Sequence, residues 1–565
     1  MAQLSRNETI KERSNLLRGT IADGLSERIS GAIAEDDTQL TKFHGVYQQD
    51  DRDLRPERAK KKMEKAFSFM ARLRVPGGIL TSRQWIALHD MAVERGNGTL
   101  RLTTRQTVQF HGVIKSNVRP AIQAINAAML DTIAACGDVN RNVICTPNPY
   151  RSAVYNDALT LTRAISTHLL PRSRAWHEVF IDGEPVIGGE QEDEPILGRT
   201  YLPRKFKIAI AVPPQNDVDV FAHDIGFIAI VESGAIVGYN VAVGGGMGMT
   251  HGEPDTFPRL GDVIGFCHPD QAVAVAEQVV TIQRDWGDRV DRKHARLKYT
   301  IERRGLATFQ AGLERRLGFT LEPARPYTFE RSGDPFGWLQ GDDGAWQYCL
   351  FVENGRVREP LLTGLRAIAQ QHDGAFIVTP NQNLIITGVT PEQKPAIEAL
   401  LAAHRLDAQS SALRRNAMAC VALPTCGLAL AESERYLPEL ITALEAEIER
   451  AGLGSDEIIV RMTGCPNGCA RPYLAEIGLV GTGPGKYNLY LGGAFDGTRL
   501  SKLYRQDLGH TEIIAALAPL FRAYAAGRDT QERFSDFVIR TGVVRPTIAG
   551  NRFHADMAAK SAVGQ

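Results

Sequence analysis

The chain has 565 residues, of which 43% are hydrophobic and 23% charged, the composition of a folded protein rather than a disordered one. Its 65 basic and 65 acidic residues cancel, so no net field recruits nucleic acid or a membrane surface, and any anion site must come from local clustering of charge. No apolar run approaches the roughly 18 residues of a membrane span, and the N-terminal residues lack the apolar core of a signal peptide, so we expect a cytosolic protein with reduced thiols.

The first 69 residues are polar and include the charge-rich runs Asp50-Asp51-Arg52-Asp53 and Lys60-Lys61-Lys62. We expect residues 1–69 to form an arm of short helices rather than part of a core. Such charge runs are typical of a solvated surface and are also suited to docking a partner. The sequence leaves both interpretations open.

An internal repeat follows the arm. Residues 102–113 and 378–389 align without a gap and share four identities in twelve positions, at Thr103 and Thr379, Gln106 and Gln382, Gly112 and Gly388, and Val113 and Val389. Before each copy, apolar residues recur at helical spacing: Trp85, Leu88 and Met91 before the first, and Leu362, Leu365 and Ile368 before the second. A second helix is predicted after each copy, near 118–130 and 391–404. The shared order favours a duplicated helix–strand–helix unit over chance.

Strands and helices alternate through the rest of the chain. Residues 207–212 and 227–231 have the apolar, β-branched character of strands, whereas 270–286 and 430–450 have the spacing of amphipathic helices. The sequence therefore predicts an α+β protein with two pseudo-symmetric halves and two larger α/β inserts. We assign 70–134 plus 333–407 to a central domain, and 135–332 and 408–565 to the two inserts.

The last four of the eight cysteines form a pattern. Five residues separate Cys420 from Cys426, and three separate Cys465 from Cys469. Four thiolates can hold zinc or an iron–sulfur cluster, and structural zinc usually prefers about two to four residues between paired cysteines, so the spacing favours a cluster. The predicted helix 430–450 begins just after Cys426, and its free N–H groups would favour a nearby anionic cluster. A zinc site and a metal-free fold remain alternatives.

Two other features are predicted to be structural. Cys136, Cys145, Cys267 and Cys349 are scattered in apolar surroundings, as small core residues are. The glycine-rich segments 244–248 and 481–486 lack the spacing of dinucleotide- and phosphate-binding loops. The sequence contains no Cys-x-x-Cys-His motif, so we expect no covalently attached c-type haem. The sequence therefore shows no place for NADPH or flavin.

The pattern Cys420-x5-Cys426 with Cys465-Pro-Asn-Gly-Cys469 resembles that of the sirohaem sulfite and nitrite reductase family. Segments over nearly the whole chain resemble it too, among them 43–49, 72–78, 203–207 and 381–383. One departure is Ala470, where glycine is expected, which concerns only the packing of that loop. The length, order and cysteine spacing are most similar to the branch that takes electrons from NADPH through a separate FAD- and FMN-containing flavoprotein.

The resemblance implies a fold and a set of cofactors. The fold is internally duplicated, with pseudo-two-fold symmetry and three α/β lobes, in which 135–332 is the first sirohaem and substrate domain and 408–565 is the cluster domain. Cys420, Cys426, Cys465 and Cys469 hold a [4Fe–4S] cluster, and Cys469 is also the axial ligand of sirohaem. The reaction implied is the six-electron reduction of sulfite to sulfide, in assimilation of sulfur for cysteine biosynthesis.

The resemblance also implies a substrate cage and cofactor contacts. Arg72, Arg141, Lys205 and Lys207 bind sulfite and supply protons. Independently, Lys205 and Lys207 are two residues apart, so on an extended segment they face the same way. The expected sirohaem contacts are Arg101, Thr103, Arg105, Thr107, Gln109, His111 and Asn467; the first six alternate along the sequence and are predicted to lie on one face of a strand. His111 is not expected to be an axial ligand.

Two alternatives stay open besides an NADPH-dependent hetero-oligomer with a flavoprotein. One is a ferredoxin-dependent sulfite or nitrite reductase of the same fold. The other is a zinc-stapled binding protein without catalytic activity.

Overall fold

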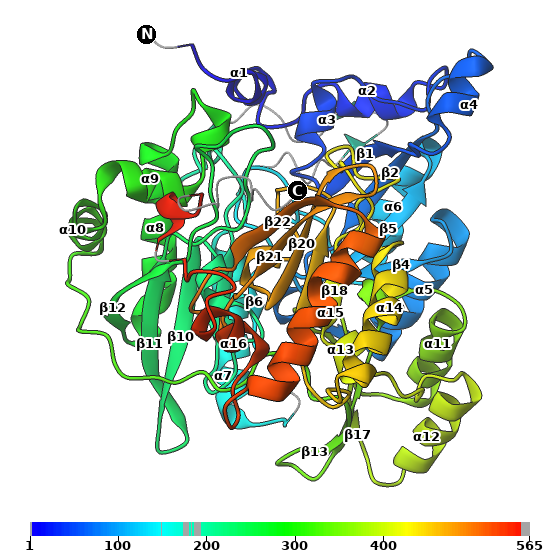
Figure 1. Ribbon diagram of the computed structural model, residues 1–565. Coiled ribbons are helices and arrows are strands. Elements are labelled where there is room, and N and C mark those ends of the chain that lie inside the picture. The colour runs from blue at the N-terminus through cyan, green and yellow to red at the C-terminus, as the bar shows by residue number, and fades with distance from the viewer. Residues whose placement is uncertain are drawn as a thin grey trace.

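The computed structural model describes residues 3–148, 150–172, 180–181, 184–185, 194–547 and 549–554. The predicted domains 135–332 and 408–565 therefore contain stretches that lie outside the described residues. Within the described residues, helices surround four five-stranded sheets, and a small ribbon pairs β7 (Phe180–Ile181) with β8 (Glu184–Pro185) (Figure 1). No helix in this part of the chain is long and apolar enough to cross a membrane.

Two of the sheets have the same strand order and exchange their edge strands. One has the order β1 (Val46–Asp50), β2 (Phe67–Arg72), β5 (Val108–Val113), β4 (Leu100–Leu102) and β15 (Arg356–Val357). The other has the order β13 (Gly337–Gln340), β14 (Trp346–Leu350), β17 (Leu384–Val389), β16 (Ala375–Val378) and β3 (Ile79–Thr81). Because β15 comes from the second half of the chain and β3 from the first, each half completes the sheet of the other.

The backbone at the two exchange points is equivalent. Gly78 and Gly355 have φ angles of 78° and 72°. A Cβ atom on Gly78 would lie 2.4 Å from the carbonyl oxygen of Val378, and one on Gly355 would lie 2.5 Å from that of Leu102. Only glycine allows both the left-handed conformation and this close approach.

The helices beside these sheets confirm the predicted repeat. Helices α5 (Ser82–Arg95) and α6 (Lys115–Ala127) belong to the first copy, and α11 (Leu361–Gln371) and α12 (Lys394–Ala403) to the second. The apolar stripes of α5 and α11 enter one shared core, where Trp85 stacks on Phe376 with ring centroids 4.9 Å apart. In Figure 1 these helices lie along one side of the molecule.

The predicted single strand through residues 101–111 is wrong. Thr103 N–H donates to the carbonyl of Thr107 at 2.9 Å, and Gln106 has a φ angle of 50°, so the chain reverses between β4 and β5. The second copy turns in the same way, since Thr379 N–H donates to Asn383 at 2.9 Å and Gln382 has a φ of 70°.

The other two sheets form a second matching pair. One has the order β6 (Ile144–Cys145), β9 (Ile208–Ala211), β10 (Ile225–Glu232), β11 (Ala235–Val243) and β12 (Asp262–Cys267). The other has β18 (Ala417–Ala419), β19 (Val460–Thr463), β20 (Ile477–Gly483), β21 (Lys486–Leu491) and β22 (Lys502–Leu508). In both, the first three strands pair in parallel and the last two antiparallel.

Helices pack beside each of these sheets. The first has α7 (Ala153–His168), α8 (Ala272–Trp286), α9 (Leu297–Arg304) and α10 (Leu306–Leu317), and the second has α13 (Ala412–Arg415), α14 (Leu437–Arg450), α15 (His510–Gly527) and α16 (Phe534–Arg540). The strands predicted at 207–212 and 227–231 and the helix at 270–286 are confirmed. The helix predicted at 430–450 begins only at Leu437, where Pro438 occupies its first turn and suits the start of a helix.

The N-terminal arm contains the expected short helices, α1 (Arg6–Arg13), α2 (Ile21–Ser26), α3 (Asp37–Leu40) and α4 (Arg55–Lys60). The prediction that it stays out of the core is wrong. Ile10, Leu17 and Phe43 belong to the core beneath β9 and α8, and β1 is a strand of the first sheet. Scattered apolar residues anchor the arm although its average composition is polar.

Candidate cofactor and substrate site

The four clustered cysteines come from the carboxyl ends of neighbouring strands. Cys420 follows β18 directly, and Cys465 lies two residues after β19, which pairs with β18 in parallel. Burial, together with the neighbouring thiols of Cys469, Cys426 and Cys465, raises the pKa of the Cys420 thiol to about 12. This mutual influence places all four sulfur atoms in one neighbourhood.

Loop N–H groups, rather than a helix terminus, approach these sulfur atoms. Gly464 N lies 3.4 Å from Cys420 Sγ, and Asn467 Nδ2 lies 3.6 Å from Cys465 Sγ. Backbone N–H groups of Leu428 and Ala429 act on Cys426 and lower its pKa against the larger effect of burial. The expected contribution from the start of helix 430–450 is wrong, because α14 begins farther along the chain.

The thiols and their donors suit a multi-iron cluster. Thiolates that accept N–H hydrogen bonds are typical iron–sulfur ligands. Among the described residues, no group of three or more His, Cys, Asp or Glu side chains is spaced to hold a single metal ion.

A cavity beside Cys469 gathers positive charge, and we call it the cationic cavity. Cys469 is exposed, unlike the other three cysteines of the group. The basic side chains that line the cavity with Cys469 and Asn467 are Arg105, Lys205, Lys207, Arg296 and Arg471. Four separate parts of the chain thus bring cations to one small space, which is suited to an anion.

The cations in this cavity suppress one another's protonation. Burial, together with the charges of Arg204 and Arg296, lowers the pKa of Lys205 to about 7. Burial also lowers the pKa of Lys207 well below its ordinary value, helped by Lys205 and Arg105. An anion bound here would relieve this repulsion, so the cavity favours anions over neutral molecules.

Arg141 and Arg72 lie near the cavity without lining it. The charge of Arg141 lowers the pKa values of both Lys205 and Arg105, so it is close to both. Burial lowers the pKa of Arg72, but Cys136, Tyr47 and Cys469 outweigh it, and the net pKa is raised. Arg72 Nη1 lies 3.2 Å from Cys136 Sγ, so Cys136, although buried as predicted, is more than a small core residue.

A row of polar side chains crosses the first sheet. Arg72, Gln109 and Arg101 are direct partners on β2, β5 and β4, so they project from the same face. The Gln109 carboxamide lies between Arg72 Nε at 2.7 Å and His111 Nε2 at 3.3 Å. Arg101 Nη2 donates to the carbonyl of Ala419 at 2.8 Å, beside the cysteine cluster.

Buried polar atoms without partners mark a surface for a polar ligand. Among the described residues, Arg105 Nε, His111 Nδ1 and Asn140 Oδ1 are buried and have no hydrogen-bond partner. Almost all buried polar atoms in folded proteins are paired, so such a group of unpaired atoms fits an additional ligand with many polar groups. Burial holds the pKa of His111 well below its usual range, so its ring is neutral.

Thr103 and Thr107 use their hydroxyl groups within the protein. Thr103 Oγ1 accepts from the N–H of Arg105 at 3.2 Å, and Thr107 Oγ1 donates to the carbonyl of Leu73 at 2.6 Å. Both therefore shape the turn that presents Arg105 to the cationic cavity.

Arg296 and Arg471 line the cationic cavity but were not predicted from the sequence. Arg296 Nη2 forms an ion pair with buried Asp224 at 2.8 Å. Arg471 pairs with buried Asp219 and donates to the carbonyls of Thr104 at 3.3 Å and Pro380 at 3.2 Å, which occupy equivalent places in the two turns. The one feature of the local sequence that could have pointed to Arg471 is its place two residues after Cys469.

The glycine-rich segment 244–248 supports the cysteine loop. Buried Lys298 donates to the carbonyls of Gly246 at 3.2 Å and Gly248 at 2.7 Å. A Cβ atom on Gly248 would lie 3.3 Å from the carbonyl oxygen of Asn467. The glycines allow close packing against residues 465–469, which explains a pattern that resembles a nucleotide motif.

Comparison with protein families reveals the repeat independently. A profile described as the nitrite/sulfite reductase ferredoxin-like half domain matches twice, at residues 61–128 and 339–404. A profile described as the nitrite and sulphite reductase 4Fe-4S domain matches residues 161–321, a stretch that does not include the four clustered cysteines. The double match confirms the duplication; the domain boundaries proposed from the sequence stay a prediction.

Whole-chain comparisons cover nearly all residues. The chain is 58% identical to the "Sulfite reductase [NADPH] hemoprotein beta-component" of Chromohalobacter salexigens, over 98% of both chains. It is 57% identical to the protein of the same name from Geobacillus kaustophilus, over 97% of both chains. The solved structure of the Mycobacterium tuberculosis NirA protein superposes with a TM-score of 0.79 at 26% identity, covering 95% of this chain and 96% of that one. These matches confirm the α+β, internally duplicated fold.

Proposed function

Because this chain belongs to the nitrite and sulfite reductase family, we propose that it reduces sulfite to sulfide by six electrons, using sirohaem and a [4Fe–4S] cluster. The observation that carries the proposal is the cationic cavity beside exposed Cys469, within the neighbourhood of four thiols. An anion bound there lies next to the residue that we propose as the shared ligand of both cofactors.

The proposed cofactor contacts divide into two groups. Cys420, Cys426, Cys465 and Cys469 would hold the cluster, and Cys469 would also hold sirohaem. Arg101, Arg105, Gln109, His111 and Asn467 contact the cofactors, while Thr103 and Thr107 hold the turn. The unpaired atoms Arg105 Nε and His111 Nδ1 support this division, because a macrocycle with many carboxylates can accept hydrogen bonds from both.

When bound, the two cofactors supply the electrons of the reaction, one after another, at a single iron. The protein's part is to hold a dianion and deliver protons as its oxygens leave as water. Lys207 in the cavity and Arg141 beside it bind the oxyanion through charge-assisted hydrogen bonds. Lys205 is the favoured proton donor, since its pKa of about 7 allows it to lose and regain a proton near neutrality. Arg72, braced by Gln109, orients the anion.

We propose that electrons come from NADPH through a separate FAD- and FMN-containing flavoprotein, with which this chain forms a hetero-oligomer. The names of the relatives, an NADPH enzyme and its beta-component, support this source over ferredoxin. Because the sequence shows no nucleotide-binding motif, electrons from NADPH would have to pass through a separate protein. We further propose a cytosolic location, because thiols must stay reduced until they bind iron.

The experiment is to purify the chain with its cofactors and assay it with two donors. Reduced methyl viologen should drive sulfite reduction by the chain alone, whereas NADPH should be oxidised only after the flavoprotein is added. Iron, labile sulfide and a Soret band should be present together. A colourless protein that contains zinc, or NADPH-driven turnover by the chain alone, would contradict the proposal.

A further inference from the structure

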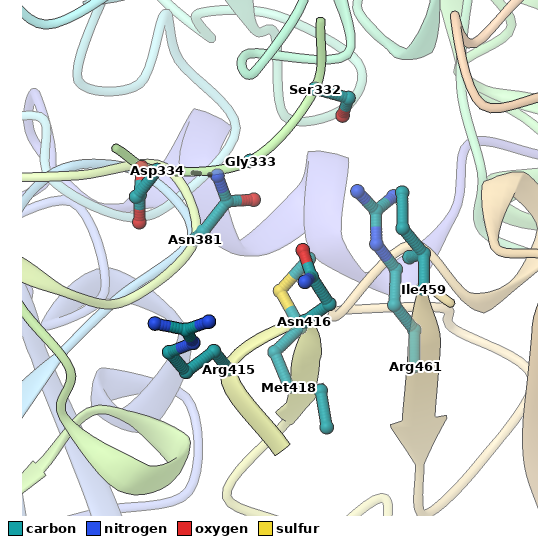
Figure 2. Close-up of a pocket in the computed structure, with 10 residues that line it drawn as sticks. Ser332, Gly333, Asp334, Asn381, Arg415, Asn416, Met418, Ile459 and Arg461 are labelled. Carbon is teal, nitrogen blue, oxygen red and sulfur yellow. Dashed lines mark hydrogen bonds between the residues drawn. The ribbon is translucent and has the colours of Figure 1, made fainter. Parts of the chain in front are cut away.

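A second polar pocket lies where the second repeat meets the lobe that carries the four cysteines. Its polar lining comes from the loop before β13, from the turn between β16 and β17, and from β18 and β19 with the residues just before them. The polar side chains are Ser332, Asp334, Asn381, Arg415, Asn416 and Arg461. Figure 2 shows Asn416 between the two guanidinium groups and Asn381 beside Asp334. Met418 and Ile459 add apolar walls.

This pocket is the pseudo-symmetric counterpart of the substrate cage. Ile144 pairs with Ala209 in one sheet as Met418 pairs with Arg461 in the other, and this register makes Arg415 the counterpart of Arg141. By the same register Ile459, just before β19, corresponds to Lys207, just before β9. The matching turns make Asn381 the counterpart of Arg105. The duplicated fold therefore has a second pocket at the equivalent place, and this pocket also contains an arginine, Arg415.

Hydrogen-bond donors in this pocket lack acceptors. Arg461 is 2% exposed, and its Nε is buried with no hydrogen-bond partner among the described residues. Arg415 packs its guanidinium over the Phe336 ring at 5.4 Å and forms no ion pair with any residue that the structure describes. Two cations therefore face the pocket with unused N–H groups.

Asp334, the single carboxylate among the residues that line the pocket, does not neutralise Arg415 and Arg461. Asp334 Oδ2 accepts from Thr379 Oγ1 at 2.7 Å and from Asn383 Nδ2 at 2.7 Å, and Oδ1 accepts from Asn381 Nδ2 at 3.3 Å. Burial raises the pKa of Asp334, and both of its carboxylate oxygens already accept hydrogen bonds within the protein. The remaining chemistry is that of an anion site.

One buried carboxylate joins this pocket to the cationic cavity. Asp219 Oδ2 accepts from Arg461 Nη1 at 2.6 Å and also from Arg471 Nε. Arg461 lines the second pocket, and Arg471 lines the cationic cavity. Asp219 and Arg471 themselves occupy equivalent places, each in a left-handed conformation before a short 3₁₀ helix, Val220–Ala222 and Pro472–Leu474.

We propose that the second pocket binds a small inorganic oxyanion, such as sulfate, and that its occupancy weakens anion binding in the cationic cavity. An oxyanion at Arg415 and Arg461 competes with Asp219 for the Arg461 guanidinium. Asp219 then neutralises Arg471 more fully, so the cationic cavity loses part of its positive charge. The effect on sulfite rests on the proposed function, whereas binding in the pocket does not.

Binding is tested by diffraction from crystals of the holoenzyme soaked in a concentration series of selenate, a heavy analogue of sulfate. We expect anomalous density within hydrogen-bond distance of Arg415 and Arg461 in the parent and in Arg405→Gln, which removes an exposed guanidinium outside the pocket. Arg415→Gln should need at least about tenfold more selenate, and Arg415→Lys should restore part of the occupancy. An empty pocket at selenate concentrations that fill the cationic cavity would refute the site.

Coupling is tested by the KM for sulfite, measured with reduced methyl viologen over a range of sulfate concentrations. Sulfate competes directly in the cationic cavity of every variant, so the difference between variants isolates the second pocket. We expect sulfate to raise the KM severalfold more in the parent and Arg405→Gln than in Arg415→Gln, with little change in kcat. Equal responses would refute the coupling even where selenate is seen in the pocket. Selenate bound by a protein without sulfite reductase activity would instead refute the proposed function and leave the site standing.

Discussion

The hairpins β4–β5 and β16–β17 share one backbone and carry opposite surfaces. Their turns make the same hydrogen bonds, from Thr103 to Thr107 and from Thr379 to Asn383. Where the first hairpin has Arg101 and Gln109, the second has Ile377 and Ile385, which belong to a small apolar core with Cys349. The two copies therefore keep the same backbone geometry. The side chains differ, because those of the first hairpin are polar and face the proposed cofactor site, whereas those of the second are apolar and pack in a core.

The loops after β9 and β19 differ in the same way. At the place of Cys469 the first lobe has Asp217, which is buried with an unpaired Oδ1, and at the place of Cys420 it has Thr146. Burial raises the pKa of Asp217 well above its usual range, so it is a neutral acid rather than a ligand. In each pair, one copy therefore carries the proposed cofactor-binding residues, and the other carries residues that serve the packing of the fold.

The largest effect is expected at these loops. Cys469→Ser should abolish binding of both cofactors, because a hydroxyl is a poor replacement for a soft thiolate. Asp217→Asn should keep both, since the amide resembles a protonated carboxyl, and Cys145→Ser should keep both as a second control. Iron, labile sulfide and the Soret band measure the outcome. A Cys469→Ser protein with normal values of all three would overturn the assignment.

The substrate cage should give the next largest effect. Lys207→Met and Arg141→Ser each remove a charge-assisted contact worth about 1.5–3 kcal/mol, which corresponds to roughly ten- to a hundredfold in turnover. Both cofactor spectra should be unchanged, and reduced methyl viologen should not rescue the rate. Lys65→Met, which removes an exposed charge, serves as the control. Parent rates in both cage variants would show that sulfite binds elsewhere.

The two hairpins can be compared directly by substitution at equivalent positions. Gln109→Leu removes the bridge between Arg72 and His111 and should lower kcat/KM about tenfold, as loss of about 1.4 kcal/mol does. Ile385→Val should cost about 0.5–1.5 kcal/mol of unfolding free energy and leave the rate unchanged. Steady-state kinetics and denaturant unfolding distinguish the two outcomes. Equal losses of rate would remove the functional distinction between the hairpins.

The smallest effect concerns pH. Lys205 binds and protonates sulfite only as an ammonium group, so the rate should fall as the pH rises through its pKa, which is about 7. The midpoint should lie at or above this value, because anionic cofactors and substrate favour the charged form. Lys205→Arg stays charged and can still bind the anion, so this decline should flatten, whereas the rate at pH 7 should be lower because a guanidinium gives up its proton poorly. An unchanged profile in the variant would assign the proton donor to another group.

Local patterns were enough to predict much of the molecule. The helical spacing of Trp85, Leu88 and Met91 and of Leu362, Leu365 and Ile368 predicted two equivalent helices, and the structure buries all six side chains in one core. The spacing of Cys420, Cys426, Cys465 and Cys469 predicted a group of four thiols, and the pKa shift of Cys420 shows their proximity. Periodicity and spacing are properties of short segments, so they can be recognised without knowledge of long-range contacts.

Short segments also misled where backbone conformation depended on contacts from elsewhere. The alternating residues 101–111 predicted a strand, yet the chain turns at Gln106, which is left-handed and whose carboxamide oxygen accepts from the N–H of Cys145 at 2.9 Å. The polar N-terminal arm was expected outside the core, yet Leu17 and Phe43 are buried against a different lobe. The average composition of a segment does not reveal the single apolar residues that anchor it in a core.

The sequence by itself determined the secondary-structure class, the duplication and the four-cysteine group. Only the tertiary structure decided which cations meet at the site: Arg105 comes from a turn of the first repeat, Arg296 from the segment before α9, and Arg471 from the loop after β19. Each is held by a partner distant in sequence, as Asp224 holds Arg296 and Asp219 holds Arg471. Buried charges are stable only when paired, and which charges pair is settled by how the lobes pack, which no local pattern records.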